Sequence, residues 1–331
     1  MWERKTATQV IRILQKYNGS KDEFLKQALG KLLNMVRILK KNVGRRSSMG
    51  SAHGWEAKQF EGGKSKGEQD MDRVVYDIKP LESDFKKIQK WSDVQNLDPV
   101  LKSCLHKIDQ LDFDVFDLRS KTSGNELVVS TVYIMQSNDY FEKLNISKQK
   151  FINYAITIQG MYNPIPYHNK THATDVMQTS YHYIEFCDCK TIANMTELEQ
   201  AVLLISAMVH DTDHPGFNNP FMVNTKDKLA LRYNDRSVLE NHHIAMAFDT
   251  MLKSEDTCIY DNFTEEMFRT LRTTMIDLVL ATDMAFHFRD LQVMKQRVTA
   301  HHWNPKEGED KKAVMSMVIH LADISNPTKS W

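Results

Sequence analysis

Hydrophobic residues recur at three- and four-residue steps through most of the chain downstream of about residue 93. Because 3.6 residues complete one turn of an α-helix, this spacing predicts amphipathic helices. The sequence shows no run of alternating strands separated by turn dipeptides. We therefore predict an all-α domain of many short helices. The clearest predicted helices cover residues 126–136, 197–209, 237–252, 266–284 and 310–323.

The N-terminal region carries the same helical spacing. Residues 5–17 and 23–41 show it, and in the second of these stretches lysine and arginine fill the positions between the leucines. We interpret residues 1–42 as a helical regulatory or dimerisation segment, which packs on itself or on the main domain. A basic amphipathic target for calmodulin is the alternative interpretation. A homodimer formed through these helices is the corresponding partner prediction.

Residues 43–92 are predicted to form a flexible linker. Six of the 12 glycines of the chain fall between Gly44 and Gly67, and the stretch is poor in aliphatic residues. Within it, "RRSS" at residues 45–48 has the two-arginine spacing that basophilic kinases read. Ser48 is therefore a candidate phosphorylation site.

Composition excludes several classes of protein. The chain has 43 basic and 43 acidic residues, which argues against a nucleic-acid-binding protein. The longest apolar run, residues 201–209, is interrupted by Ser206 and is too short to span a bilayer. The N-terminal residues contain no apolar signal-peptide core. The four cysteines show no disulfide framework, so we expect a cytoplasmic protein in a reducing compartment.

Histidine is concentrated in one half of the chain. Of 13 histidines, 11 lie from His168 onward, which prompts a search for a metal or proton-transfer site. His168 and His172 are spaced i and i+4, so a helix would place both on one face. The zincin motif shares this spacing, but it requires a glutamate where this chain has Asn169. A metalloprotease is therefore rejected.

Further candidate ligands stand at the ends of two apolar helices. His210 and Asp211 end the first helix, where Pro215 and Gly216 force a loop. Asp323 ends the second, and a buried carboxylate there is costly unless it is paired or binds a metal. Two imidazoles and two carboxylates suit zinc, and one carboxylate can bridge to magnesium or manganese. Two such metals activate a bridging hydroxide for attack on phosphorus. The predicted ligands are His172, His210, Asp211 and Asp323.

Five stretches of the chain carry a family resemblance. "PYHNKTHATDVMQ", "HDTDHPGFNN", "YNDRSVLENHH", "LATDM" and "LADISNP" occur in this order. They closely resemble the motifs of class I 3′,5′-cyclic nucleotide phosphodiesterases, and "LDFDVFDL" at 111–118 resembles the start of that catalytic domain. The resemblance implies a compact, multi-helix HD-type phosphohydrolase domain over residues 93–331. Other HD-type phosphohydrolases are disfavoured, because "HNKTH" and "DHPGFNN" resemble the cyclic nucleotide phosphodiesterase motifs.

The resemblance implies a role for each matching residue. His172, His210, Asp211 and Asp323 match the zinc ligands, and Asp211 also matches the carboxylate that reaches a second metal, usually magnesium. His168 matches the general acid that protonates the leaving O3′. Residues that hold waters of the second metal are matched by His214, Glu240 and Thr282. Those that line the nucleotide pocket are matched by Tyr167 and Asn326.

Glu240 also has a competing local interpretation. "SVLE" at residues 237–240 has the pattern of a capping box, in which Ser237 caps a helix and Glu240 reaches back to it. One rotamer of Glu240 cannot fully serve both the cap and the metal waters. The local pattern alone favours the cap, whereas the family resemblance favours the metal waters.

The implied reaction is hydrolysis of a cyclic nucleotide to a 5′-monophosphate. Asn326 in "DISNP" resembles the members that prefer cyclic AMP, so we expect cyclic AMP to be favoured over cyclic GMP. Catalytic domains of the family continue with helices that bring a glutamine and a phenylalanine to the purine. We expect this chain to lack those C-terminal helices and to have low activity alone. The alternative is a weak or inactive product that binds or dimerises with a full-length phosphodiesterase.

Overall fold

The computed structural model describes residues 97–300 and 302–329, and every regular element within them is a helix. The predicted all-α class is therefore confirmed. The helical segment 1–42, the linker 43–92 and the phosphorylation site at Ser48 lie outside the described residues. In chain order the elements are α4 (Pro99–Leu105), α5 (Val115–Lys121), α6 (Glu126–Ser137), α7 (Tyr140–Lys143), α8 (Lys148–Met161), α9 (Lys170–Glu185), α10 (Cys189–Ile192), α11 (Glu197–Val209), α12 (Asn219–Asn224), α13 (Lys228–Arg232), α14 (Val238–Lys253), η2 (Glu255–Thr257), α15 (Glu265–Leu280), η3 (Met284–Phe286), α16 (His287–Thr299), α17 (Gly308–Asp323) and η4 (Asn326–Thr328).

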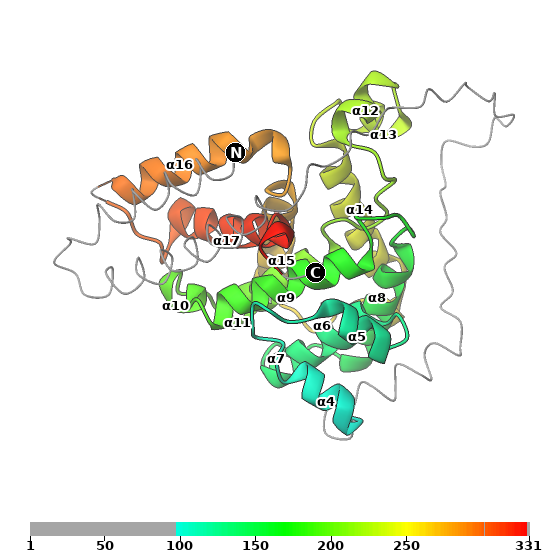
Figure 1. Cartoon of the computed structure of the whole chain (residues 1–331). Coiled ribbons are helices and arrows are strands. Elements are labelled where there is room, and N and C mark those ends of the chain that lie inside the picture. Colours follow the sequence, from blue (N-terminus) through cyan, green and yellow to red (C-terminus); the bar gives the residue numbers. More distant parts are fainter. Residues whose placement is uncertain (1–96, 301, 330–331) are drawn as a thin grey trace, which may run out of the picture.

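Helix α11 is largely buried and lies next to α9 (Figure 1). It begins with a capping box, in which the Glu199 backbone N–H donates to Thr196 Oγ1 and the Thr196 N–H donates to the Glu199 carboxylate. Every residue from Ala201 to Val209 is buried, and the helix packs against α9 and α15. The C-terminal end of α11 is consequently held inside the molecule.

Helices α9 and α17 also reach the region around the C-terminal end of α11. Helix α9 packs against α6, α11 and α17, and Figure 1 shows α17 lying across α9. Asn169 caps α9, because its Oδ1 accepts from the backbone N–H groups of Thr171 at 2.9 Å and His172 at 3.3 Å. Helix α17 buries Val318 and Ile319 and ends at Asp323. The start of α9 and the ends of α11 and α17 therefore lie close together.

The predicted helices are present, with one substantial change of bounds. The helix expected over residues 266–284 ends at Leu280 instead. The Thr282 hydroxyl donates to the Val279 carbonyl at 2.8 Å, and Asp283 Oδ1 accepts from the Ala285 N–H at 2.9 Å. These side chains compete with the backbone ladder and start the turn η3. Apolar periodicity continued through this turn and concealed it.

None of the helices in the described part of the chain combines the length and the apolar character needed to cross a bilayer.

Candidate metal centre and active site

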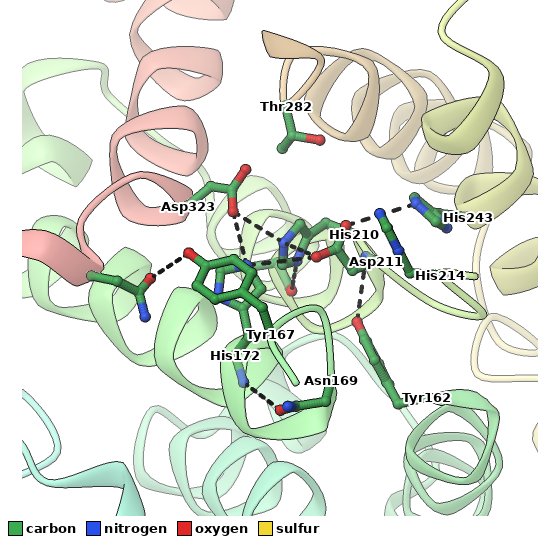
Figure 2. A network of polar contacts seen from close by, with 12 residues as sticks. Tyr162, Tyr167, Asn169, His172, His210, Asp211, His214, His243, Thr282 and Asp323 are labelled. Carbon is green, nitrogen blue, oxygen red and sulfur yellow. Dashed lines mark hydrogen bonds and ion pairs between the residues drawn. The ribbon is translucent and has the colours of Figure 1, made fainter. Parts of the chain in front are cut away.

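Four predicted ligands are brought together by three helix ends (Figure 2). His172 projects from the first turn of α9, and His210 and Asp211 follow the last residue of α11. Asp323 is the final residue of α17. His172 and His210 are 5% and 1% exposed, and Asp211 is 8% exposed. The donor atoms are thus concentrated in a nearly dry region.

The distances between these donor atoms are short and similar. His172 Nε2 lies 2.9 Å from Asp323 Oδ1 and 3.5 Å from Asp211 Oδ2. His210 Nε2 lies 3.4 Å from Asp323 Oδ1 and 3.3 Å from Asp211 Oδ2. Ligands about 2.1 Å from a common ion lie about 3.0 Å apart in an octahedron and about 3.4 Å apart in a tetrahedron. The four separations therefore match the edges of a coordination shell.

Two donor atoms in the cluster have no hydrogen-bond partner. His210 Nε2 and Asp211 Oδ2 are buried and unsatisfied, although they lie within salt-bridge distance of each other. Buried polar atoms are rarely left in this state, because desolvation without a partner costs free energy. Two unsatisfied atoms 3.3 Å apart, within a group of donors that lie within 4.8 Å of one another, fit a divalent cation as the missing partner. The residues therefore form a group that can hold a metal ion.

Asp211 faces a second group of donors. Donor atoms of Asp211, His214 and His243 lie within 4.8 Å of one another, and His243 Nε2 is 3.7 Å from Asp211 Oδ1. The His243 Nδ1 atom donates to the Thr212 carbonyl at 2.6 Å, which leaves Nε2 directed at Asp211. One oxygen of Asp211 thus faces His172 and His210 while the other faces His243. Such a carboxylate is placed to bridge two cations.

His243 is a site residue that sequence reasoning missed. It lies within "YNDRSVLENHH", and the resemblance of that stretch gives a role to Glu240 but none to His243. The available signal was its position three residues after Glu240 on the predicted helix, which places both side chains on one face of α14.

Electrostatics also favour a cation at the cluster. Burial disfavours ionisation of Asp211, but His210, His172 and His243 outweigh it and hold the pKa of Asp211 well below its ordinary value. Burial likewise opposes protonation of His210, yet Asp211 and Asp323 hold the pKa of His210 well above its ordinary value. The ionised carboxylates of Asp211 and Asp323 are therefore compensated in part by a proton on His210. A metal ion would replace that proton.

His168 lies beside the cluster but outside α9, which begins at Lys170. The expectation that one helix face presents His168 and His172 is wrong, because Asn169 caps the helix between them. The two rings are 5.9 Å apart, and His168 stacks on His214 with centroids 4.0 Å apart. Burial lowers the pKa of His168 below its ordinary value and that of His214 to about 4. The extended entry into α9 nevertheless keeps His168 next to the ligands.

The capping box predicted at residues 237–240 is not formed. Ser237 has a left-handed backbone with φ of 41°, and its hydroxyl donates to Asp283 Oδ2 at 2.8 Å. Glu240 Oε2 instead accepts from Asn219 Nδ2 at 2.9 Å. Burial raises the pKa of Glu240 to about 7. The competing local interpretation of this glutamate is therefore removed.

Thr282 is one of the remaining predicted site residues. Figure 2 places it near Asp323 and outside the dashed contacts. Its hydroxyl donates to the backbone of its own turn at Val279.

Tyr167 and Asn326, also predicted site residues, form a pair at the edge of the cluster. The Tyr167 hydroxyl donates to Asn326 Oδ1 at 3.3 Å. Tyr167 is 47% exposed, so the pair borders both the buried ligands and solvent.

The loop after α11 is held in part by Asn163 and His242, which sequence reasoning did not single out. Asn163 Nδ2 donates to the His214 carbonyl at 3.0 Å and to Asp213 Oδ1 at 3.2 Å. Asp213 Oδ2 contacts His242 Nε2 at 2.8 Å. Gly216 has a φ of 88°, a region that glycine enters without strain. These contacts hold His214 against the cluster.

Comparison with known proteins identifies relatives of this chain. Residues 167–331 match the family described as 3′,5′-cyclic nucleotide phosphodiesterase. A high affinity cAMP-specific and IBMX-insensitive 3′,5′-cyclic phosphodiesterase 8 of Drosophila melanogaster is 35% identical over 237 residues, covering 70% of this chain and 26% of that protein. A dual specificity calcium/calmodulin-dependent 3′,5′-cyclic nucleotide phosphodiesterase 1B of Mus musculus is 33% identical over 231 residues, covering 69% of this chain and 42% of that protein. The chain therefore spans less than half the length of these relatives.

Solved structures agree with the sequence matches. The phosphodiesterase domain of a rhodopsin phosphodiesterase from Salpingoeca rosetta aligns with a TM-score of 0.60 and 33% identity, covering 67% of this chain and 65% of that one. A second structure of the phosphodiesterase domain of the RhoPDE fusion protein from the same choanoflagellate aligns with a TM-score of 0.59 and 32% identity, covering 66% of this chain and 67% of that one.

Proposed function

Since this chain belongs to the 3′,5′-cyclic nucleotide phosphodiesterase family, we propose that it hydrolyses 3′,5′-cyclic nucleotides to nucleoside 5′-monophosphates. The convergence of two histidines and two carboxylates beside His168 is the observation that carries this proposal. Hydrolysis of a phosphodiester is promoted by a cation that offsets phosphate charge and by an acid that protonates the leaving oxygen. Both requirements have candidate residues in one small region.

The proposed cofactors are two divalent ions. Zn²⁺ would be held by His172, His210, Asp211 and Asp323, whose nitrogen and oxygen donors suit that ion. Mg²⁺ or Mn²⁺ would be reached by the second oxygen of Asp211. When bound, the two ions would supply positive charge at the phosphate and lower the pKa of water for attack on phosphorus. Waters of the second ion would be held by His214, His243, Glu240 and Thr282.

His168 is the proposed general acid. It carries a proton to O3′ as the P–O3′ bond breaks, so the leaving group departs as a neutral hydroxyl. Its stacking on His214 orients the ring, and partial burial shields the proton from solvent. Its lowered pKa makes the protonated form a stronger acid, while the carboxylate of Asp211 offsets part of that effect. Tyr167 and Asn326 would border the nucleotide on the open side.

We propose cyclic AMP as the favoured substrate. The relative from Drosophila melanogaster is named as cAMP-specific, whereas that from Mus musculus is named as dual specificity. Asn326 in "DISNP" resembles the members that prefer cyclic AMP. The ratio of kcat/KM for cyclic AMP and cyclic GMP tests the preference, and a ratio below one would contradict it.

The test of function is a hydrolysis assay with Zn²⁺ and Mg²⁺ in which the 5′-monophosphate is quantified by chromatography. We expect turnover that falls by about 10²- to 10⁴-fold in His168→Ala, the range typical of a general acid. Asp323→Ala should abolish turnover, whereas exposed His106→Ala should leave it unchanged. Turnover unaffected by His168→Ala and Asp323→Ala would overturn the assignment. Absence of turnover with nucleotide binding intact would favour the alternative, a binding or dimerisation partner of a longer phosphodiesterase.

Residues 1–42 carry two partner proposals. One is a homodimer formed through these predicted helices, and the other is calcium-dependent binding of calmodulin. The relative from Mus musculus is named as calcium/calmodulin-dependent. Mass measurement in solution, with and without calmodulin and calcium, tests both. A monomer that does not shift with calmodulin would exclude them.

A further inference from the structure

Lys329 inserts its ammonium group into a buried polar niche on α9. Its Nζ atom lies 2.5 Å from Asp175 Oδ1 and 3.4 Å from Gln178 Oε1, and it also donates to Thr179 Oγ1. The side chains of Lys329 and Asp175 are only 9% and 5% exposed. An ion pair buried to this degree is uncommon, because both charges lose their hydration.

The two members of this pair stand close in sequence to opposite metal ligands. Asp175 lies one helical turn after His172 on α9, so both side chains project from the same face. Lys329 follows Asp323 by six residues. The pair therefore joins the helix that carries one ligand to the segment that carries another.

The segment between Asp323 and Lys329 is stiffened by short local hydrogen bonds. Ser325 Oγ donates to the Ala322 carbonyl at 2.6 Å, and Thr328 Oγ1 donates to the Ser325 carbonyl at 2.6 Å. The backbone N–H of Thr328 also donates to the Ser325 carbonyl at 2.8 Å, and that of Lys329 donates to the Asn326 carbonyl at 3.2 Å. Pro327 removes a further rotation from this turn. A displacement of Lys329 is therefore transmitted to Asp323.

We propose that the Lys329–Asp175 ion pair is a positioning device that sets the distance between Asp323 and His172, and with it the geometry of the donor set. This inference depends on one part of the proposed function, namely that the donor set binds a metal. Sites of this kind tolerate errors of about 0.5 Å, so supporting contacts matter for affinity. A buried ion pair can hold the ligands this tightly. Because no water reaches the buried carboxylate of Asp175, it has no partner that could replace Lys329.

A second ion pair, at the other end of α17, supplies a matched comparison. Lys311 Nζ lies 2.6 Å from Glu199 Oε2, with side chains 14% and 18% exposed. It fixes the opposite end of α17 to the start of α11, 12 residues before Asp323. Loss of this pair should weaken the fold without moving the ligand end of α17. The two pairs thus separate positioning from general stabilisation.

The test is the Zn²⁺ affinity of the full chain, measured by competition with a chromophoric chelator well below the melting temperature. We expect Lys329→Met to lower the affinity for Zn²⁺ about tenfold, as removal of a supporting contact around a metal site does. Lys311→Met should lower the melting temperature and retain wild-type affinity. The Co²⁺-substituted protein should show a changed visible spectrum in Lys329→Met and an unchanged one in Lys311→Met.

Asp175→Asn covers the case in which Lys329→Met does not fold. Its amide oxygen can still accept from Lys329, so we expect a smaller loss of Zn²⁺ affinity in a folded protein. Wild-type affinity in the folded variants would overturn the positioning role, and so would equal losses in Lys311→Met. Failure of the wild-type chain to bind Zn²⁺ would instead overturn the proposed function. The two failures are therefore distinguishable.

Discussion

His172 Nε2 and Asp323 Oδ1 lie 2.9 Å apart, although 151 positions separate the two residues in the sequence. One stands in the first turn of α9 and the other is the last residue of α17. The contact joins the beginning and the end of the site-bearing part of the chain. Formation of the donor set therefore requires that the helices between them pack first or together with it.

Asp323→Asn should remove the carboxylate charge while preserving the shape of the side chain. Replacing a residue that only hydrogen-bonds to a metal ligand already lowers metal affinity about 10- to 100-fold. We therefore expect loss of the ligand itself to lower the affinity for Zn²⁺ by more than about 100-fold. Calorimetric titration measures it. Asp310→Asn on the same helix is the control, since Asp310 pairs with Arg297 away from the cluster. Equal affinities in the two variants would contradict a ligand role for Asp323.

Tyr167→Phe should affect substrate binding more than the chemical step. The change removes a hydroxyl that donates to Asn326 Oδ1 at 3.3 Å and so releases the amide to rotate. A lost hydrogen bond of about 0.5–1.5 kcal/mol corresponds to a rise in KM for cyclic AMP of about 2- to 10-fold. Steady-state kinetics would show this with kcat nearly unchanged. A fall in kcat at constant KM would assign Tyr167 a different role.

Glu240→Gln should stabilise the metal-free protein at high pH. Burial raises the pKa of Glu240 to about 7 from its ordinary value of 4.5, so the native state holds a proton that the unfolded state releases. Stability therefore falls as pH rises from 4.5 to 7, and the penalty is complete at pH 8. Removing the ionisable group should raise the free energy of unfolding at pH 8 by about 3 kcal/mol, since its pKa differs by about 2.5 between the folded and unfolded states.

Urea denaturation with a chelator present measures the effect of Glu240→Gln. The exposed Glu266→Gln should show no such gain. We also expect Glu240→Gln to weaken binding of the second, Mg²⁺-type ion. A gain in stability that persists at pH 4 would contradict the titration argument.

His182→Asn should reduce the sensitivity of folding to acid. Burial lowers the pKa of His182 below 6.5, and its Nδ1 donates to the Asp109 carbonyl at 2.6 Å. The unfolded state therefore takes up a proton near pH 6.5 that the native state resists, so stability is lost as pH falls. Replacing His182 should reduce the slope of unfolding free energy against pH by up to about 1.4 kcal/mol per pH unit. The amide of the new asparagine can still donate a hydrogen bond to the Asp109 carbonyl.

The slope of unfolding free energy against pH, measured by urea titration from pH 7 to pH 5, checks the effect of His182→Asn. The matched control, His106→Asn, changes an exposed histidine and should keep the wild-type slope. An identical slope in His182→Asn would show that this histidine does not contribute to acid sensitivity.

The fold class was predictable because helical periodicity is a local property. In α11 the capping residues Thr196 and Glu199 and the buried run that follows are adjacent in sequence, so the prediction for residues 197–209 agrees with the structure. At Thr282 the same approach failed. A side-chain hydrogen bond to Val279 ended α15, and apolar spacing carries no information about that competition.

For the candidate site, the sequence predicts which residues can be ligands and their order along the chain, but not how they are arranged in space. "HNKTH", "HD" and "LAD" mark His172, His210, Asp211 and Asp323, since buried imidazoles and carboxylates at helix ends need a partner. His243 was missed because its role depends on α14 lying opposite the loop after α11. Its spacing from Glu240 places both side chains on one face of α14, but this spacing alone does not distinguish it from a histidine that is merely buried.

The sequence by itself determined which segments are helical and which side chains can bind a metal, because both depend on spacing and chemistry within a few residues. Only the tertiary structure decided that Asp323 meets His172, that Ser237 contacts Asp283 instead of capping its helix, and that Lys329 enters the niche of Asp175. These outcomes depend on how α9, α14 and α17 pack. Packing is set by the sum of many distant contacts, and short motifs do not record that sum.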